Sequence, residues 1–464
     1  MKTTKTFTMA ATLAVLTCFD CRPSTHLSIK KYLGKMMLSG TNKGRSLLRR
    51  PLLSNHSQIQ RGMDLTFNVF SKFLATFTLL GYLTACGGGS ATANTQTPAP
   101  PTPLSVASAL FAEKALSASG QLACASCHTD DNAHADATGT TLPIGGVNMD
   151  QQGFRSSPSL LYLASNTAFR FVNGLPFGGF TWDGRANSRA EQAAGPLLDS
   201  TEMANADVAA VARKVRSLNY FNDFMSQFNV SAAATDQQIF EKLKTALQTY
   251  QELDTDYLLF NSKFDREADG TYTFTPSERS GRDLFNNPDK GNCASCHTSR
   301  NGPNGERPVF TNFSYAALGL PRNMQIQKNA ADATFFDKGL CGPNRTDLST
   351  RTELCGQFKV PTLRNIELTS PYFHNASIFN LTQAVSFYAT RDIDPGLWYP
   401  SVNDKFNDLP LAERGNVIRT APFGQQPGDR PVLSAQDVDD LVSFLKTLTD
   451  DRTAPQGSPT VVAR

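Results

Sequence analysis

Two copies of one pentapeptide, Cys-Ala-Ser-Cys-His, constrain this chain more than any other sequence feature. They occupy residues 124–128 and 293–297. Cys-x-x-Cys-His is the attachment motif of c-type haem, because two thiols at this spacing add to the haem vinyl groups and the adjacent imidazole binds the iron. We therefore expect two covalently bound haem c groups, held by Cys124, Cys127 and His128 and by Cys293, Cys296 and His297.

Two other chemistries use cysteine pairs, and the spacing disfavours both. A zinc site would place its two Cys pairs about 15–20 residues apart. A thioredoxin-like redox pair would occur once, on a βαβ unit. Here the pairs are far apart in the sequence, each has its own histidine, and the surrounding pattern is helical.

The residues before both motifs favour helices. Leu104, Ala107 and Leu110 recur at helical spacing ahead of the first motif. Ahead of the second, residues 275–278 form a capping box with proline at the first helical position. No run of alternating strands is evident, and further helices are expected at 204–217, 236–253, 380–390 and 435–448, the last with Ser434 as its N-cap.

The chain has 464 residues, enough for two domains and a targeting segment. Because each half of the sequence contains a helix, a turn and a haem motif, we predict a mainly α fold of two cytochrome c-like haem domains. Their expected limits are residues 106–270 and 271–450, with an exposed tail at 451–464. The final helix could still pack back on the first domain.

The first 85 residues resemble a targeting segment. An apolar run at 69–85 is too short to span a bilayer and ends at Leu83-Thr84-Ala85-Cys86, which resembles a bacterial lipobox. We expect a lipoprotein signal peptide with translation starting at Met63, lipidation of Cys86, and a Gly/Ser/Thr/Pro tether at 86–105. A leftover buried cysteine is the alternative for Cys86.

The net charge of +3 reflects this N-terminal segment. Residues 1–85 hold 12 of the 44 basic residues and two of the 41 acidic ones, so the rest of the chain carries a formal charge of −7. Removal of the segment leaves no basic excess, and we expect no nucleic-acid partner.

Cys341 and Cys355 remain after the haem motifs and the targeting segment are accounted for. They are separated by a polar loop containing Gly342 and Pro343. In an oxidising compartment such a pair predicts a disulfide.

Several ordered motifs resemble those of a known family. They are the two CASCH motifs, FTWDGRANSRAEQAAGPLLDSTEMA at 180–204, and FKVPTLRNIELTSPYFHNASIFNLTQAVSFYATRD at 358–392. Over roughly residues 105–450 the chain resembles the bacterial di-haem cytochrome c peroxidases and their MauG-like relatives. The resemblance implies two haem domains that face each other, the first reacting with hydrogen peroxide and the second passing electrons.

The family also implies a location and partners. We expect a periplasmic protein that touches the outer membrane through its lipid anchor only. Its partners would be hydrogen peroxide and a small redox protein, a cytochrome c or a cupredoxin, or else an unknown oxidisable substrate. A non-catalytic di-haem electron-transfer cytochrome is the alternative function, and an acid/base pair at the first haem would distinguish the two.

Four residues match the family's catalytic positions. Trp182 matches the tryptophan between the haems, although a lone Trp is more often a core residue. Gln192 and Glu202 match the polar pair over the peroxide-binding haem, and Pro196 matches the distal-pocket proline. Taken alone, Glu202 would be a solvated residue beside a helix cap at Ser200 and Thr201.

The resemblance also implies metal ligands beyond the two histidines. Tyr388 lies fourteen residues after His374, at the position of the second haem's axial ligand, and Met324 remains an alternative ligand. A phenol oxygen favours higher iron oxidation states than a thioether does. A calcium ion between the domains would use Thr369, Pro371 and Ser156.

The stretch GGVNMDQQGFRSSPS at 145–159 lacks the histidine that blocks the first haem in many family members. We expect His134 to be a surface loop residue, and Met149 is the one residue in the stretch that could still cap the iron. The prediction is a first haem that reacts with peroxide without prior reduction.

Overall fold

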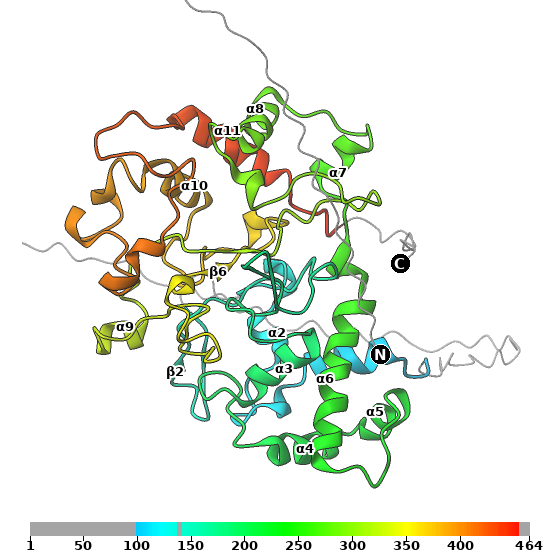
Figure 1. Cartoon of the computed structure of the whole chain (residues 1–464). Helices are drawn as coiled ribbons and strands as arrows, with labels where there is room; N and C mark the ends of the chain where they lie inside the picture. Colours follow the sequence, from blue (N-terminus) through cyan, green and yellow to red (C-terminus); the bar gives the residue numbers. More distant parts are fainter. Residues whose placement is uncertain (1–98, 137–141, 454–464) are drawn as a thin grey trace, which may run out of the picture. The chain divides into compact units, whose positions relative to one another are not determined.

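Helices carry most of the regular structure of the computed structural model, which describes residues 99–136 and 142–453 (Figure 1). Cys86 and residues 86–98 of the expected tether lie outside the described residues, as do Met63 and the expected signal peptide. The helices are α1 (Pro103–Phe111), α2 (Cys124–Cys127), α3 (Arg189–Leu198), α4 (Val208–Arg216), α5 (Phe221–Gln227), α6 (Asp236–Leu253), α7 (Lys263–Ala268), α8 (Pro276–Asn286), α9 (Gln327–Ala331), α10 (Leu381–Thr390) and α11 (Ala435–Lys446).

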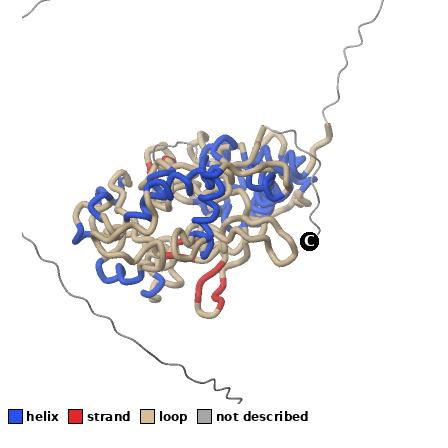
Figure 2. The backbone as a smooth tube through the Cα atoms, turned by 90° about the horizontal axis from the view of Figure 1, so that it is seen from above, coloured by secondary structure: helices blue, strands red, loops and turns tan. Residues whose placement is uncertain are grey.

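Strands are few and short among the described residues (Figure 2). They pair as three antiparallel two-stranded sheets, β1 with β2, β3 with β4, and β5 with β6. Their bounds are β1 (Ile144–Gly145), β2 (Gln151–Gln152), β3 (Arg170–Val172), β4 (Leu175–Phe177), β5 (Tyr315–Ala316) and β6 (Phe358–Lys359). The expectation of a mainly α fold is confirmed.

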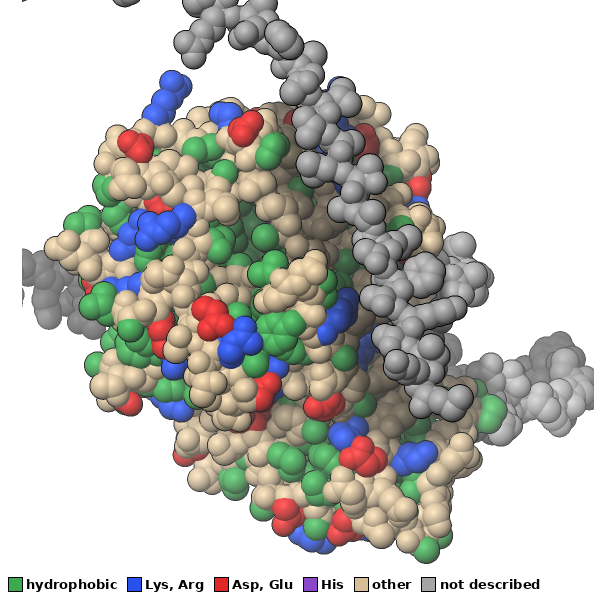
Figure 3. Space-filling model, viewed as in Figure 1, with side chains coloured by type: hydrophobic (Ala, Val, Ile, Leu, Met, Phe, Trp, Pro, Cys, Tyr) green, Lys and Arg blue, Asp and Glu red, His purple; other side chains and the backbone are tan. Residues whose placement is uncertain are grey.

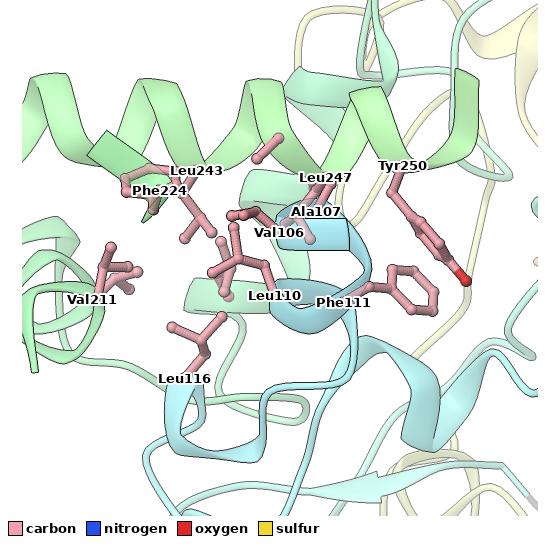
Figure 4. Close-up of a cluster of buried hydrophobic side chains, with 14 of the residues drawn as sticks. Val106, Ala107, Leu110, Phe111, Leu116, Val211, Phe224, Leu243, Leu247 and Tyr250 are labelled. Atoms are coloured by element: carbon pink, nitrogen blue, oxygen red, sulfur yellow. The ribbon is translucent and has the colours of Figure 1, made fainter. Parts of the chain in front are cut away.

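One hydrophobic cluster lies between α1 and α6 (Figure 4). The apolar face of α1 carries Val106 and Leu110, which pack toward Leu243 and Leu247 of α6. Helix α6 begins at a capping box on Thr235, whose hydroxyl accepts from the backbone N–H of Gln238. Helices α3 and α4 also pack against α6, so α6 contacts three other helices of this cluster.

A second cluster is built by α8 and α11, which lie side by side (Figure 1). Phe285 of α8 and Phe444 of α11 meet edge to face, with ring centroids 5.3 Å apart. The backbones approach so closely that a Cβ at Gly281 would collide with the carbonyl oxygen of Asp440. Both helices begin at capping boxes, on Thr275 and Ser434; the sequence predicts the capping box at Thr275 and the N-cap at Ser434.

Polar contacts connect the segment after α11 to residues earlier in the chain, including Tyr162 of the first cluster. The Tyr162 hydroxyl donates to a carboxylate oxygen of Asp450, at 2.7 Å, just after α11. Asn261 exchanges hydrogen bonds with the backbone of Asp451. The segment after the last helix therefore contacts residues near positions 162 and 261, before the second haem motif. No helix in the described part of the chain is both long and apolar enough to cross a membrane.

Candidate functional site

The first pentapeptide forms a wall of a large cavity. Helix α2 carries Cys124 and Cys127, both half-buried free thiols, and His128 follows as its C-cap. The Nδ1 of His128 lies 2.8 Å from the carbonyl oxygen of His134. If Nδ1 carries the proton and donates it there, Nε2 keeps its lone pair, the form in which histidine binds a metal. Burial lowers the pKa of His128, which favours this neutral form.

The second pentapeptide repeats this arrangement in another cavity. Cys293 lies in a short 3-10 helix, Cys293–Ser295, and Cys296 and His297 follow. The Nδ1 of His297 lies 2.9 Å from the carbonyl oxygen of Phe310, and burial lowers the pKa of His297 to about 4. Each cavity thus offers two thiols, a neutral imidazole and mostly apolar walls, a donor set that fits a covalent haem c.

His134 is not the surface residue expected from the sequence. Its side chain is 1% exposed and stacks on the ring of Tyr257, with centroids 4.5 Å apart. The reason is its backbone: the His134 carbonyl must reach His128, which turns the loop inward through a left-handed φ of 52°. His134 does not line the first cavity, and Met149 packs against the first hydrophobic cluster instead of lining it.

Three residues that the family resemblance predicts for the peroxide-binding pocket line the first cavity. Gln192 and Pro196 come from α3, which begins at the N-cap Ser188, and Glu202 follows in the turn after that helix. The turn is fixed because the Glu202 carbonyl accepts from the backbone N–H of Gly146 over 2.8 Å. All three residues line the same cavity as His128.

The carboxyl of Glu202 is electrostatically perturbed. It is accessible from the cavity, yet the surrounding protein disfavours its charge. Burial raises the pKa of Glu202 to about 7, the negative charge of Asp199 adds to the rise, and Arg185 opposes it. A carboxyl with a pKa near neutrality can both accept and donate a proton under physiological conditions.

Trp182 lines both cavities. Its indole Nε1–H donates to the carbonyl oxygen of Ser156 over 2.8 Å, and its ring meets that of His374 edge to face at 6.4 Å. Its backbone carbonyl accepts from the backbone N–H of Lys359 over 2.8 Å. These contacts hold the indole in one position on the wall shared by the two cavities.

The residue after Trp182 anchors an ionic network. Asp183 is fully buried and accepts hydrogen bonds from Arg155, at 2.7 Å, and from Arg185, at 2.9 Å. Arg155 also binds Asp337 through two hydrogen bonds of 2.6 and 2.7 Å. Burial alone would raise the pKa of Asp183, but the two guanidinium groups lower it to about 2. The network ties the Trp182 loop to a distant segment of the chain.

Tyr388 lines the second cavity together with His297. It lies on α10, and its ring stacks on that of Phe423 with centroids 5.2 Å apart. Burial raises the pKa of its phenol, and the neighbouring Cys293 and Cys296 add to the rise. Met324, the alternative ligand, is 59% exposed and is not among the residues that line this cavity.

The three residues expected to bind calcium, Ser156, Thr369 and Pro371, all line the first cavity. The Ser156 hydroxyl donates to the carbonyl oxygen of Phe373 over 2.8 Å. Cys341 and Cys355 form a disulfide, the pairing expected from the sequence.

Sequence reasoning missed two residues of the cavity walls. Lys359 lines both cavities, and His374, stacked on Phe358 with centroids 3.4 Å apart, lines the second. Both lie inside the motif at 358–392, but neither residue type signals a cavity by itself. The two-residue strand β6 that places Lys359 is too short for an alternating pattern to be recognised.

Comparisons with known proteins agree with this arrangement. A family model described as di-haem cytochrome c peroxidase matches residues 105–273. The methylamine utilization protein MauG of Paracoccus denitrificans is 33% identical over 363 residues, which cover 75% of this chain and 88% of that protein. The cytochrome c551 peroxidase of Nitrosomonas europaea is 32% identical over 278 residues, covering 60% and 69% of the two chains.

A solved structure is also similar over most of its length. The diheme peroxidase BthA from Burkholderia thailandensis has a TM-score of 0.69 and 37% sequence identity, covering 76% of this chain and 87% of that one. The likeness in sequence to MauG and in structure to a diheme peroxidase shows that this chain belongs to the bacterial di-haem cytochrome c peroxidase and MauG family, as a peroxidase-like enzyme with two haem c groups.

Proposed function

We propose that the protein is a hydrogen-peroxide-dependent oxidoreductase in which peroxide is cleaved at the first cavity and electrons arrive from the second. The observation that carries the proposal is the difference between the two cavities. Gln192, Pro196 and Glu202 line the first cavity. The second is mostly apolar around Tyr388, and the one carboxylate among its described lining residues, Asp408, accepts from Asn375 and lies 3.3 Å from His374. A non-catalytic electron carrier, the alternative, has no use for an acid/base residue beside one haem.

Haem iron, when bound, supplies a Lewis-acidic redox centre for peroxide. The Glu202 carboxylate accepts a proton from one peroxide oxygen and returns it to the other, which then leaves as water. The Gln192 amide hydrogen-bonds the substrate and orients it. Pro196 contributes an apolar surface with no N–H donor, which limits competing water.

Trp182 is the relay in this proposal. Its position on both cavity walls supports electron passage from the second site to the first, because an indole π-system can lose an electron transiently and divide one long step into two. When haem is bound in the second cavity, Tyr388 and His297 would hold its iron. The hard oxygen of Tyr388 favours higher iron oxidation states.

The remaining assignments are proposals drawn from the sequence. We place the first haem domain, the peroxidatic one, at 106–270 and the electron-transfer domain, facing it, at 271–450. A calcium ion would use the oxygens of Ser156, Thr369 and Pro371. The protein would be periplasmic, lipid-anchored at Cys86, and reduced by a small redox protein or by an oxidisable substrate.

Rapid mixing of the fully oxidised holoprotein with hydrogen peroxide tests this function. His128 is the only histidine among the described residues that line the first cavity, so no internal imidazole has to leave before peroxide binds. We expect an immediate change in the haem absorbance. No change either before or after one haem has been reduced would contradict the proposal, whereas a change only after reduction would show that a further ligand blocks the first haem.

A further inference from the structure

Lys359 lies on the wall shared by the two cavities. Strand β6 carries it, and its backbone N–H is bonded to the carbonyl oxygen of Trp182. Its Nζ donates to the carbonyl oxygen of Gly179 over 2.9 Å and lies 5.8 Å from the centre of the Phe180 ring. The Lys359 side chain is therefore fixed at its backbone end by the bond to Trp182 and at its ammonium end by the bond to Gly179.

The charge of Lys359 has no paired carboxylate in the described part of the chain. No Asp or Glu oxygen there lies within 4.0 Å of its Nζ. By contrast, Arg155 and Arg185 of the first cavity are both bonded to Asp183. A lysine ammonium has three N–H donors, and Lys359 uses one of them on a neutral carbonyl.

Lys359 is the only lysine or arginine among the described residues that line the second cavity. A haem in this cavity brings two propionate carboxylates, and a carboxylate removed from water is costly unless it is paired. The mostly apolar wall offers Lys359 as the one strong cationic partner.

We propose that Lys359 binds a propionate of the haem attached at Cys293 and Cys296, from a position where its charge also acts on the haem attached at Cys124 and Cys127. The inference rests on the two haem sites of the proposed function. It adds a positioning and charge-compensating residue that the two sites share. Peroxide chemistry is not required for it.

Spectroelectrochemical titration of the holoprotein tests the proposal. A positive charge near a haem favours the reduced iron, so Lys359→Met should lower the second haem's reduction potential. We expect a tenfold or larger change in its reduction equilibrium, about 59 mV for a one-electron couple. The first haem's potential should fall by less, and Lys359→Arg should keep both potentials close to those of the wild type.

Two variants serve as comparisons. Lys446→Met removes the same charge from a side chain that is 52% exposed and paired with Glu367, and it should shift neither potential. Lys359→Gln provides a second neutral variant if the methionine variant folds poorly, and covalent haem content verifies each preparation. Unchanged potentials in the neutral Lys359 variants, or a shift equal to that of Lys446→Met, would overturn the inference.

The outcome is separable from that of the proposed function. If the wild-type protein fails to react with peroxide, its two potentials can still be measured, and the Lys359 comparison still decides the propionate assignment. A normal peroxide reaction with unshifted potentials would reject Lys359 alone.

Discussion

Glu202 is the side chain whose chemistry depends most on its surroundings. Burial and the charge of Asp199 raise the pKa of Glu202 to about 7, so this carboxyl titrates close to neutral pH. Because the proposed base is the carboxylate, the wild-type rate of reaction with peroxide should rise with pH through about 7 and then level off. Stopped-flow absorbance across this pH range measures the profile.

Removing this carboxylate should remove both the rate and its pH dependence. We expect Glu202→Gln to slow the peroxide reaction by about 10²- to 10⁴-fold and to flatten the profile near pH 7. Glu191→Gln is the matched control, because Glu191 lies on α3, the helix just before Glu202, but accepts from the backbone N–H of Asn187. A Glu202→Gln protein with both haems and the wild-type rate would refute the role.

The proposed role of Tyr388 as a ligand of the second haem iron can be tested by substitution. Tyr388→Met should place a thioether beside the second haem, raise its reduction potential, and produce a charge-transfer band at roughly 700 nm. Met324→Leu should leave the spectrum and potential of the wild type unchanged, because the exposed Met324 does not line the cavity. A band in this region in the wild-type protein that Met324→Leu abolishes would show that Met324 is the ligand.

The haem attachment residues and the disulfide could be predicted from residue types and spacing alone, whereas the other residues that line the cavity walls could not. The two pentapeptides and the pair Cys341 and Cys355 have spacings or counts with a chemical meaning. The environments of His134 and Lys359 depend on backbone turns and on strands two residues long, which leave no periodic signal. His134 was therefore misplaced at the surface, and Lys359 was overlooked.

Arg364 links several elements at once. It is fully buried, donates to both carboxylate oxygens of Asp265 on α7, and donates twice to the carbonyl oxygen of Pro308. Its guanidinium also lies within 6 Å of four aromatic rings, those of Tyr162, Phe260, Phe264 and Phe310. Removing Arg364 would leave the buried Asp265 carboxylate without its two shortest ionic contacts, and Arg307, at 3.3 Å, would be its remaining ionic partner among the described residues.

We expect Arg364→Ala to lower the free energy of unfolding by about 3–5 kcal/mol, measured by urea denaturation. Burial alone raises the pKa of Asp265, but bonding to Arg364 lowers it below its ordinary value. This contribution to stability is present above the ordinary carboxyl pKa and is lost as the pH falls through the folded-state pKa. The difference between variant and wild type should therefore shrink in acid.

An exposed pair provides the control for this element. Arg351 is 46% exposed and paired with Glu353, so Arg351→Ala should change stability by less than about 1 kcal/mol. Equal losses for the two arginine variants would contradict the argument from burial.

Helix starts were the most predictable local feature, because capping residues act within one turn. Thr275 and Ser434 begin α8 and α11, and α6 has the predicted limits 236–253. The helix expected at 204–217 begins later, at Val208, because the Asp207 side chain accepts from the N–H of Ala210 and sets the cap there. The loop at Thr181, with a left-handed φ of 73°, has no comparable signal, although it sets the position of Trp182.

On the face of the molecule shown in Figure 3, basic and acidic side chains are interspersed with hydrophobic ones. Without residues 1–85, the formal charge is −7 before the haem propionates are added. We expect a basic donor protein to be favoured, with an oxidation rate that falls as ionic strength rises beyond about 0.1 M. Steady-state oxidation of a basic cytochrome c at several salt concentrations measures this.

A small neutral donor gives the comparison, because its encounter with the enzyme gains little from net charge. Its oxidation should change little over the same salt range. A rate with the basic cytochrome that is the same at low and high salt would count against electrostatic docking.

In both cavities a main-chain carbonyl oxygen lies beside the Nδ1 of the attachment histidine. Each attachment histidine is oriented by a main-chain oxygen, that of His134 or of Phe310. No side-chain replacement deletes a main-chain oxygen, so the basicity of the two imidazoles is insulated from sequence drift. We therefore expect substitutions that change reactivity to act through the other side chains of each wall, such as Glu202 in one cavity and Tyr388 in the other.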